Sequence, residues 1–421
     1  MFYLCVEIIR KMKRIFLLVI FIISLLSLKG QNNQPYPHIL LSDTAQISLL
    51  TSTPWDKVPY ALFGHTAIRI NDPKQNIDVV YNYGIFSFGN SVLSFSLRFI
   101  KGNTYYIVAA VDYPYYLQEY EERGVAVIEQ VFNLTQEEKQ AIYNALVINA
   151  LPQNREYLYN YLEDNCSTRP RDIIQEYVHG TIEYTPTNKQ QTYRDLIHEC
   201  VDIQPWTKFG IDLIIGADAD TIITDRQKDF LPIYLMNAYN GATIKNDTVR
   251  PLLSYTHNIL EASPLNKDYS LKPIYAGLIV LIITILLSLF VYKKNWTILG
   301  KIYDTLLFLV AGLGGCIIFY LMFFSIHPCV DPNWNLTWLN PLQLIVAFLF
   351  FVKPLTKFLY YYHFINFVAL LIFLLAWSLI PQQLDIAFIP FILSIMVRSG
   401  MNILHSKKLK KRTDYSLPKP R

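Results

Sequence analysis

The last third of the chain carries apolar segments long enough to cross a lipid bilayer, and they constrain the fold more than any other feature. Residues 273–292 (PIYAGLIVLIITILLSLFVY) have the length and composition that a transmembrane helix needs. Four more apolar segments follow, at residues 304–326, 341–352, 364–380 and 384–397. The segment 341–352 is short, and its neighbours must extend it. We therefore predict an all-α transmembrane bundle of about five helices over residues 271–400.

Basic residues in the connections orient this bundle. Lys293 and Lys294 follow the first predicted helix, Lys353 and Lys357 the third, and the segment KKLKKR the fifth. The loops at residues 327–340 and 381–383 contain no lysine or arginine. Because short basic loops stay in the cytoplasm, residues 401–421 are predicted to be a basic cytoplasmic tail. The large N-terminal part then lies outside the cytoplasmic membrane, and the chain is a multi-pass protein of the bacterial inner membrane.

The first 30 residues independently predict export. Basic residues precede an apolar run from Ile15 to about Leu28, as in a signal peptide or N-terminal anchor. Met12 is an alternative start, and cleavage near Gly30 or retention as an anchor both remain open. We predict a periplasmic domain over residues 31–270. The net charge is only +4 and no basic patch is interleaved with aromatic residues, so no nucleic-acid partner is expected.

The exported part alternates between strand and helix patterns. HTAIRI and IDVVYNYGIF, separated by the polar turn NDPKQN, predict a β-hairpin, and TYYIVAAVDY and GVAVIEQVF predict two further strands. Thr135 and Glu138 form a capping-box pattern at the start of a helix that ends before Pro152. Further helices are expected in QTYRDLIHECV, FGIDLIIGADAD and DFLPIYLMNAY. The domain is therefore predicted to be α+β with a small antiparallel sheet.

Cys166 is the candidate nucleophile. Pro170 is tolerated only in the first turn of a helix, so the helix that ends at Gly180 should begin near residues 165–167. A thiol at a helix N-terminus is expected to have a lowered pKa. The free backbone N–H groups from Asn165 to Ser167 could stabilise an oxyanion during acyl transfer.

His65 is the candidate general base for this cysteine. It begins a predicted strand, and Gly64 before it permits close approach of a substrate or another chain segment. His179 is excluded because it lies at the opposite end of the helix that Cys166 begins. A third group should orient the imidazole, and the next strand offers Asn82, which we favour, or its neighbours Tyr81 and Tyr83.

Other interpretations of these residues remain open. Cys166 could form a disulfide with Cys200 or Cys329, in which case the chain would be a non-catalytic membrane scaffold. The aspartates of ADADTIITD are closely spaced, but the pattern lacks the spacing and terminal glutamate of a calcium-binding loop. We therefore predict neither a metal nor a cofactor.

The order of the two segments carries a resemblance. FGHTAIRI precedes NCSTRPRD by about a hundred residues, which resembles the permuted NlpC/P60 papain-like enzymes, including the lecithin:retinol acyltransferase-like group. Residues 39–239 resemble the Lnb N-terminal periplasmic domain family through FGHTAIRI, YNYGIFSF, FIKGNTYY, NREYLYNYLEDNCSTRPRD and FGIDLIIGADAD. The membrane part is similar through HPCVDPNWNLTWLNPLQL. The fold implied is an α+β papain-like domain followed by the transmembrane bundle.

The resemblance implies lipoprotein N-acylation. An acyl chain would pass from a phospholipid donor to Cys166, with His65 as the base, and then to the α-amine of a diacylated lipoprotein. Arg169 would position the helix or bind a phosphate, or else it would pair with an acidic neighbour such as Glu163. NlpC/P60 relatives also include cell-wall peptide hydrolases, but such an enzyme does not need a five-helix membrane anchor.

The external loop at residues 327–340 completes the set of candidates. Trp334 and Trp338 suit the interface between membrane and water, where aromatic rings accumulate. Four polar residues of the loop could bind a lipid headgroup, contact the periplasmic domain or only cap helix ends: His327, Asn333, Asn335 and Asn340.

Overall fold

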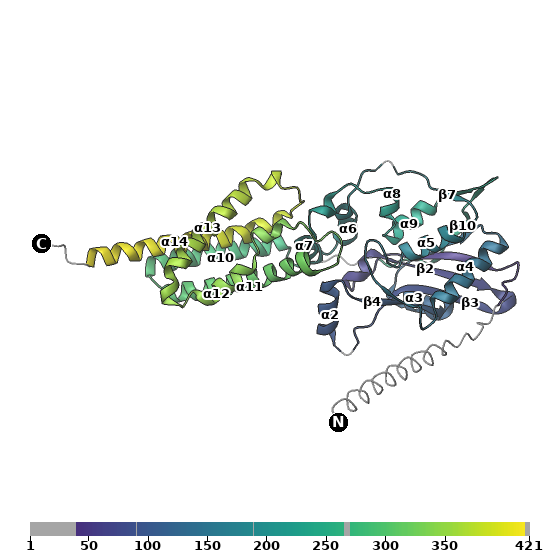
Figure 1. The fold of residues 1–421 in the computed structure, drawn as a ribbon, viewed down its shortest axis with the longest axis horizontal. Helices are drawn as coiled ribbons and strands as arrows, with labels where there is room; N and C mark the ends of the chain where they lie inside the picture. The colour runs from purple at the N-terminus through teal and green to yellow at the C-terminus, as the bar shows by residue number, and fades with distance from the viewer. Residues whose placement is uncertain (1–38, 90, 188, 265–269, 417–421) are drawn as a thin grey trace, which may run out of the picture. The chain divides into compact units, whose positions relative to one another are not determined.

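The computed structural model describes residues 39–89, 91–187, 189–264 and 270–416. The predicted signal peptide or anchor at residues 1–30 lies outside the described residues. From Leu41 onwards the described chain belongs to one compact unit, in which an α+β domain is followed by a helical membrane region (Figure 1). This order of the two parts confirms the predicted fold class.

A seven-stranded antiparallel sheet forms the centre of the periplasmic domain, with the order β10-β5-β1-β2-β3-β4-β6 (Figure 1). Its strands are β1 (Gln46–Ser52), β2 (His65–Asp72), β3 (Ile77–Ile85), β4 (Tyr105–Asp112), β5 (Val127–Phe132), β6 (Glu156–Leu158) and β10 (Leu253–Leu260). The predicted hairpin is the pair β2 and β3, and the two other predicted strands are β4 and β5. The sheet is larger than predicted, because β1 is buried along almost its whole length and shows no alternation that the sequence could reveal.

Helices surround this sheet and a second, three-stranded sheet of β7 (Thr181–Glu183), β8 (Thr243–Lys245) and β9 (Val249–Pro251). The helices are α2 (Val92–Lys101), α3 (Tyr113–Arg123), α4 (Gln136–Asn149), α5 (Thr168–Tyr177), α6 (Tyr193–Val201), α7 (Pro205–Ile214), α8 (Asp225–Lys228) and α9 (Pro232–Tyr239). The capping box at α4 is confirmed, with the Thr135 N–H donating to Glu138 Oε2 at 2.7 Å.

Two apolar cores hold the elements that carry the site. In the first, Tyr116 and Tyr120 of α3 pack on Leu50, Ala67 and Val80 of strands β1, β2 and β3. Burial of these side chains fixes α3 against the sheet.

The second core joins the segment before α5 to helix α6 and the residues that follow α7. Leu162 packs there with Leu196, Ile215 and Leu231, all of them buried. The segment that carries Cys166 is therefore held by a core of its own, separate from the one beneath the sheet.

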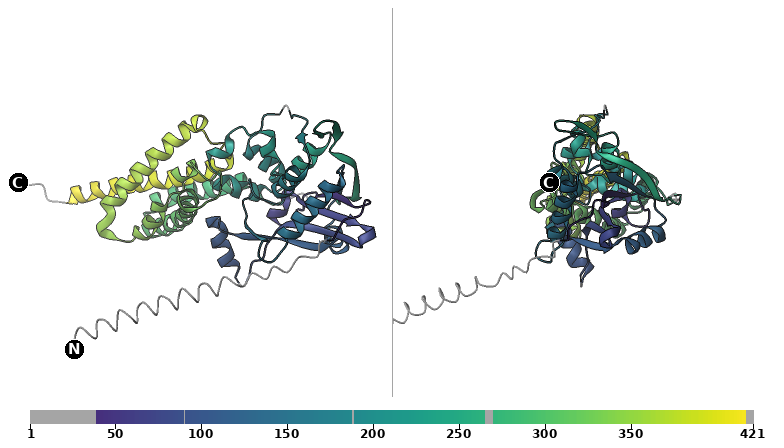
Figure 2. Two further views of the ribbon diagram at one scale, coloured as in Figure 1. Left: turned by 45° about the vertical axis from the view of Figure 1, so that its right-hand side comes forward. Right: turned by 90° about the vertical axis from the view of Figure 1, so that its right-hand side faces the viewer.

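The five predicted apolar segments fall on five helices: α10 (Pro273–Lys294), α11 (Thr297–Phe324), α12 (Pro341–Leu349), α13 (Thr356–Leu375) and α14 (Ile389–Ser416). In the described residues, α10, α11, α13 and residues 386–408 around α14 are long and apolar enough to cross a membrane. With nine residues, α12 is shorter than a span. Helix α14 packs against α10 and α13, and α11 packs against α12 (Figure 2).

Two details of the membrane region were not part of the prediction. The segment predicted as a tail continues α14 as far as Ser416, because nothing in it interrupts the helix. Trp338 is not on an exposed surface. It is only 4% exposed and contacts Phe388 inside the bundle, where its indole N–H donates to Asn335 Oδ1 at 2.9 Å. Trp334 is 40% exposed.

Candidate active site

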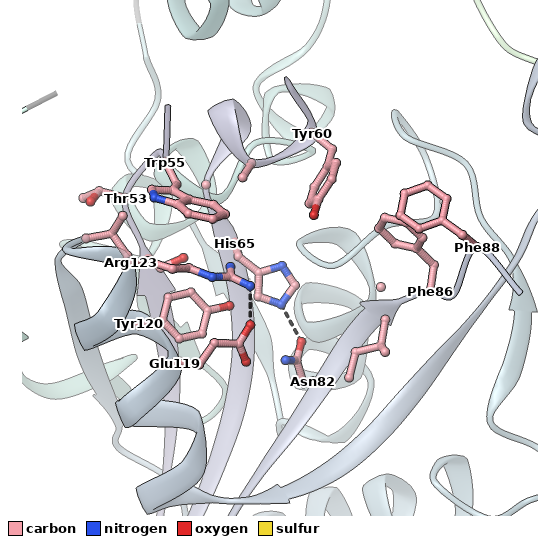
Figure 3. A pocket seen from close by; sticks show the side chains of 16 residues that line it. Thr53, Trp55, Tyr60, His65, Asn82, Phe86, Phe88, Glu119, Tyr120 and Arg123 are labelled. Carbon is pink, nitrogen blue, oxygen red and sulfur yellow. Dashed lines mark hydrogen bonds and ion pairs between the residues drawn. The ribbon is translucent and has the colours of Figure 1, made fainter. Parts of the chain in front are cut away.

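Neighbouring strands bring His65 and Asn82 together. His65 is the first residue of β2, and Asn82 lies on the adjacent strand β3. His65 Nε2 lies 2.5 Å from Asn82 Oδ1 (Figure 3). Because the carbonyl oxygen of Asn82 can only accept, Nε2–H is the donor, and Nδ1 is left unprotonated as a potential base.

Tyr81 and Tyr83 do not contact the imidazole. Successive side chains of a strand point to opposite faces of the sheet, and the two tyrosines share the face opposite to Asn82. The Tyr83 hydroxyl accepts a hydrogen bond from Asn149 Nδ2 at 3.0 Å, on the other side of the sheet. Of the three candidates in the sequence, the structure therefore pairs Asn82 with His65.

Gly84 brings Cys166 and His65 to one point. Its φ of +89° is a conformation that residues with a side chain rarely adopt. A β-carbon at this position would lie 3.3 Å from Cys166 Cβ and 3.9 Å from His65 Cε1. The cysteine and the imidazole therefore both border the space that a side chain at Gly84 would fill.

Gly64 has a different role from Gly84. Its φ is +74°, and a β-carbon there would lie 2.7 Å from the backbone oxygen of Ser52 in β1. Close approach of another chain segment, one of the two possibilities expected for this glycine, is present, and Gly64 also lines the cavity described below. It allows β2 to begin directly beside β1 and so fixes where His65 enters the sheet.

Cys166 immediately precedes Ser167, the N-cap of α5, as predicted. The side chain of Asn165 accepts hydrogen bonds from backbone N–H groups at the start of this helix. Its Oδ1 accepts from the N–H of Ser167 at 2.7 Å and of Thr168 at 3.0 Å, while its own N–H donates to Thr168 Oγ1 at 2.8 Å. Of the N–H groups from Asn165 to Ser167 that were expected to bind an oxyanion, those of Asn165 and Ser167 are therefore already occupied, and in the described part of the chain that of Cys166 is not. The backbone N–H groups of Thr66 and Cys166 are instead the ones that act on the sulfur, and they lower the pKa of the thiol.

Burial sets the protonation of both groups. It raises the pKa of Cys166 to about 11, against the opposing effect of hydrogen bonds from the backbone of Thr66 and Cys166. The expected lowering at a helix start is wrong, because Asn165 takes the helical N–H groups and desolvation disfavours the thiolate. Burial also lowers the pKa of His65 to about 4, although the hydrogen bond with Asn82 raises it. At neutral pH the resting pair is thus a thiol and a neutral imidazole.

A cavity of about 290 Å³ opens onto the imidazole of His65 and is also lined there by Asn82 and Gly84 (Figure 3). Its lining is mostly apolar and aromatic at one side: Tyr60, Ala61, Ile85, Phe86, Phe88. Cys166 is not part of the lining; it lies next to Gly84, which is, and it is 9% exposed. An elongated apolar group could therefore enter the cavity and present one end to the imidazole.

The other side of the cavity carries two charged residues that the sequence did not single out. Arg123 forms an ion pair with Glu119 one turn earlier on α3. Its guanidinium lies 5.1 Å from the ring centres of both Trp55 and Tyr120, and its charge contributes to lowering the pKa of His65. An acidic and a basic residue four apart are common on any exposed helix, so the sequence contained no signal for this position.

Arg169 supports the segment that carries Cys166. Its Nε and Nη2 donate to the two carboxylate oxygens of Asp164, at 2.5 and 2.8 Å. Its guanidinium also stacks 3.7 Å above the ring of Tyr157. The expected ion pair of Arg169 is therefore present, but its partner is Asp164. Glu163 was the wrong partner, and its carboxylate accepts from Asn160 instead.

The polar residues of the external loop lie away from the lining of the cavity. His327 Nε2 donates to the Phe99 carbonyl oxygen at 2.5 Å, and its ring packs against Phe99 and Tyr161. Asn333 and Asn335 donate to backbone oxygens at the end of α7. Asn340 precedes α12, and its N–H donates to Gln343 Oε1 at 3.3 Å. These residues contact the periplasmic domain or cap helices, which were two of the three roles expected for them.

The structure also bears on two other features of the sequence, a possible disulfide of Cys166 and the closely spaced aspartates of ADADTIITD. Cys166, Cys200 and Cys329 are all free, so the disulfide that a scaffold would need is not formed. In the ADADTIITD segment, Asp220 is held by Arg194, whose Nε donates to its Oδ1 at 2.6 Å.

Comparison with known proteins matches both parts of the chain. Residues 36–199 match the family model described as the Lnb N-terminal periplasmic domain, and residues 265–410 match the one described as the Lnb transmembrane domain. The first match contains His65, Asn82 and Cys166, and the second contains all of α10 to α13. No curated protein and no solved structure matches the chain.

Proposed function

Because the chain belongs to the Lnb family and carries its periplasmic and transmembrane domains in succession, we propose that it is a lipoprotein N-acyltransferase. The family indicates a membrane-bound, lipoprotein-modifying enzyme of the inner membrane with a periplasmic N-terminal domain. The proposal adds the reaction: an acyl chain moves from a phospholipid to Cys166, and from there to the α-amine of a diacylated lipoprotein.

One observation carries this proposal. Cys166 and His65 both border the space beside Gly84, and Asn82 holds the Nε2 side of the imidazole, so that Nδ1 is available to take a proton. A nucleophile, a base and a group that orients the base are the set required for covalent acyl transfer.

In the first half-reaction, Cys166 Sγ attacks the carbonyl carbon of the donor ester while Nδ1 of His65 takes the thiol proton. The negative charge on the carbonyl oxygen is stabilised by the backbone N–H groups of Thr66 and Cys166, which lie beside the sulfur. The C–O bond of the ester then breaks, and the imidazolium returns its proton to the departing lysophospholipid. A thioester remains on Cys166.

In the second half-reaction, the neutral α-amine of the lipoprotein attacks the thioester carbonyl carbon. His65 takes a proton from the attacking amine and gives it to the sulfur as the C–S bond breaks. The products are an amide on the lipoprotein and a free thiol. Because the resting pair is neutral, each half-reaction begins and ends in the same protonation state.

The membrane anchor fits substrates that are themselves lipids. Moving an acyl chain from a bilayer into water costs about 0.8 kcal/mol for each exposed CH₂ group. A domain that is continuous with helices of the membrane can receive the chain without exposing it. Arg123, at the polar side of the cavity, supplies a cation for the phosphate of the donor.

The test is the acylation state of a lipoprotein in cells that carry this enzyme alone. With Cys166→Ser at equal expression, mass spectrometry of the lipoprotein's N-terminal peptide should show only the diacylated form. Cys200→Ser removes another free cysteine of the same domain and should leave triacylation unchanged. Continued triacylation with Cys166→Ser would overturn the proposal, as would equal losses in both variants.

A further inference from the structure

Helix α2 exposes an apolar surface that no described part of the chain covers. Val92, Leu93 and Leu97 are 64%, 70% and 60% exposed, whereas Phe95 is buried on the inner side of the helix. Arg98 and Lys101 add positive charge to the last turn. Such a helix, with a wide apolar face and flanking basic residues, is typical of segments that lie in the surface of a membrane.

The end of α2 is joined to the external end of a membrane span. The N–H of Ile326, just beyond α11, donates to the Lys101 carbonyl oxygen at 3.1 Å. His327 Nε2 donates to the Phe99 carbonyl oxygen at 2.5 Å. Gly102 ends the helix with a φ of +78°, and a β-carbon there would lie 2.7 Å from Ile326 Cγ1. Only glycine therefore lets the two segments meet so closely.

The apolar surface of α2 lies beside exposed apolar side chains of the span, because the end of α2 contacts the end of α11. Phe323, Phe324 and Ile326 at the end of α11 are 56%, 58% and 59% exposed, as side chains in contact with lipid would be. Since α11 is long and apolar enough to cross the membrane, we infer that its external end lies at the level of the outer leaflet's surface. The same level is thereby set for α2, and lipid is the occupant that covers both surfaces.

A row of aromatic rings leads from α2 to the cavity. Phe99 and Phe95 of the helix have ring centres 6.3 Å apart, and Phe95 lies 5.0 Å from Phe88 and 5.4 Å from Phe86. Phe86 and Phe88 both line the cavity that opens onto His65. The row is thus an apolar connection between the span's external end and the imidazole.

From these contacts we propose that α2 lies in the outer leaflet of the membrane and that its aromatic row guides the donor's acyl chain into the cavity. This inference rests on the proposed function for its second half, because only an enzyme with a lipid donor needs such an entry path. The location of α2 in lipid stands without it. The flanking Arg98 and Lys101 meet the phosphates of the headgroups.

A crosslinking experiment tests the location of α2 independently of catalysis. The full-length protein is placed in phospholipid nanodiscs, with a photoreactive benzoylphenylalanine in place of Leu93, Leu97 or Ile148 in turn. Ile148 is a matched control, because it is 49% exposed on α4 of the same domain. We expect lipid adducts at positions 93 and 97 and none at 148. Adducts no more frequent at 93 and 97 than at 148 would overturn the inference.

An activity measurement tests the entry path. Leu93→Glu combined with Leu97→Glu should lower the rate of lysophospholipid release from membrane donors by about tenfold or more, because burying a carboxylate in the leaflet is unfavourable. Release from a short-chain, water-soluble donor should be unchanged, which also shows that the variant is folded. Ile148→Glu should leave both rates unchanged.

The outcomes separate the inference from the proposed function. If the wild-type protein transfers no acyl group from either donor, the proposed function fails, while the lipid adducts still decide where α2 lies. If membrane-donor activity survives the two substitutions undiminished, the entry path fails although the enzyme remains an acyltransferase.

Discussion

The site around His65 and the cluster around Arg194 are both buried polar regions of the periplasmic domain, yet they differ in how completely their groups are paired. Arg194 has no exposed side-chain surface and donates to Asp212, to Asp220 and to two backbone oxygens. His198 also donates to Asp212. The imidazole of His65, in contrast, is held by Asn82 on one side and faces the cavity on the other.

The difference teaches how burial is used in each place. Around Arg194 the cost of desolvating charges is offset by partners inside the protein, so the cluster holds α6, the end of α7 and η3 (Ala217–Asp220) together. Around His65 and Cys166 burial instead keeps both groups neutral and leaves hydrogen-bonding capacity for a substrate. Substitutions in the first region should therefore affect stability, and those in the second should affect catalysis.

The largest effect is expected at His65. His65→Ala should lower the rate of lysophospholipid release by about 10⁴-fold, because a buried thiol with a raised pKa cannot attack without a base. Stopped-flow or quenched-flow release from a fluorescent donor measures the rate. The midpoint of thermal unfolding should not fall. If His65→Ala lowered both the midpoint of thermal unfolding and the rate, the two regions would no longer differ in the property that each one supports.

Arg194→Leu should have the converse effect. It leaves Asp212 and Asp220 buried without their cation and should lower the free energy of unfolding by about 3–5 kcal/mol. Denaturant unfolding of the detergent-solubilised protein measures this change. In Lys189→Leu the exposed pair with Glu199 is lost, and the change should stay below about 1 kcal/mol. Equal changes in the two variants would contradict the structural role assigned to the cluster.

Asn82→Ala sharpens the comparison within the site. Without its acceptor the imidazole can rotate and change tautomer, so kcat should fall by about 10²-fold while the donor's KM changes little. Steady-state kinetics with a phospholipid donor measures both constants. Tyr81→Phe alters the neighbouring side chain on the opposite face and serves as the control. A rise in KM without a fall in kcat would mean that Asn82 binds substrate.

Arg123→Ala should have a smaller effect, on binding. Loss of the cation should raise KM for a phospholipid donor by about tenfold and leave KM for an uncharged acyl ester unchanged. Equal increases for both donors would show that Arg123 acts only by holding Trp55 and Tyr120 in place.

The smallest expected effect is that of pH between mildly acidic and mildly alkaline values. With the pKa of His65 near 4 and that of Cys166 near 11, the rate of acyl-enzyme formation should be constant from roughly pH 5 to pH 10 and fall below that range.

The free energy of unfolding should also depend on the protonation of His65. Unfolded His65 binds a proton below about pH 6.5 and the folded state only below about pH 4, so the free energy of unfolding decreases as the pH falls through this window. If the resting pair were instead a thiolate and an imidazolium, the rate of acyl-enzyme formation would change with pH between roughly pH 5 and pH 10.

Much of the fold could be predicted from local sequence. The membrane spans follow from uninterrupted apolar length, the β2–β3 hairpin from two strand patterns around a polar turn, and α4 from its capping box. The start of α5 followed from the position of Pro170. Strand β1 and helix α2 were missed, because β1 is buried on both faces and the apolar residues of α2 lie in a short segment of ten residues.

The sequence by itself determined which residues are chemically able to act: a histidine at the start of a strand, a cysteine before a helix and an asparagine on the next strand. These positions depend on neighbours a few residues away, and such local patterns are visible in one chain. Only the tertiary structure decided that the cysteine is a buried thiol, that Asp164 holds Arg169 and that Arg123 enters the site. Desolvation and long-range pairing arise from segments far apart in the sequence, so no local pattern encodes them.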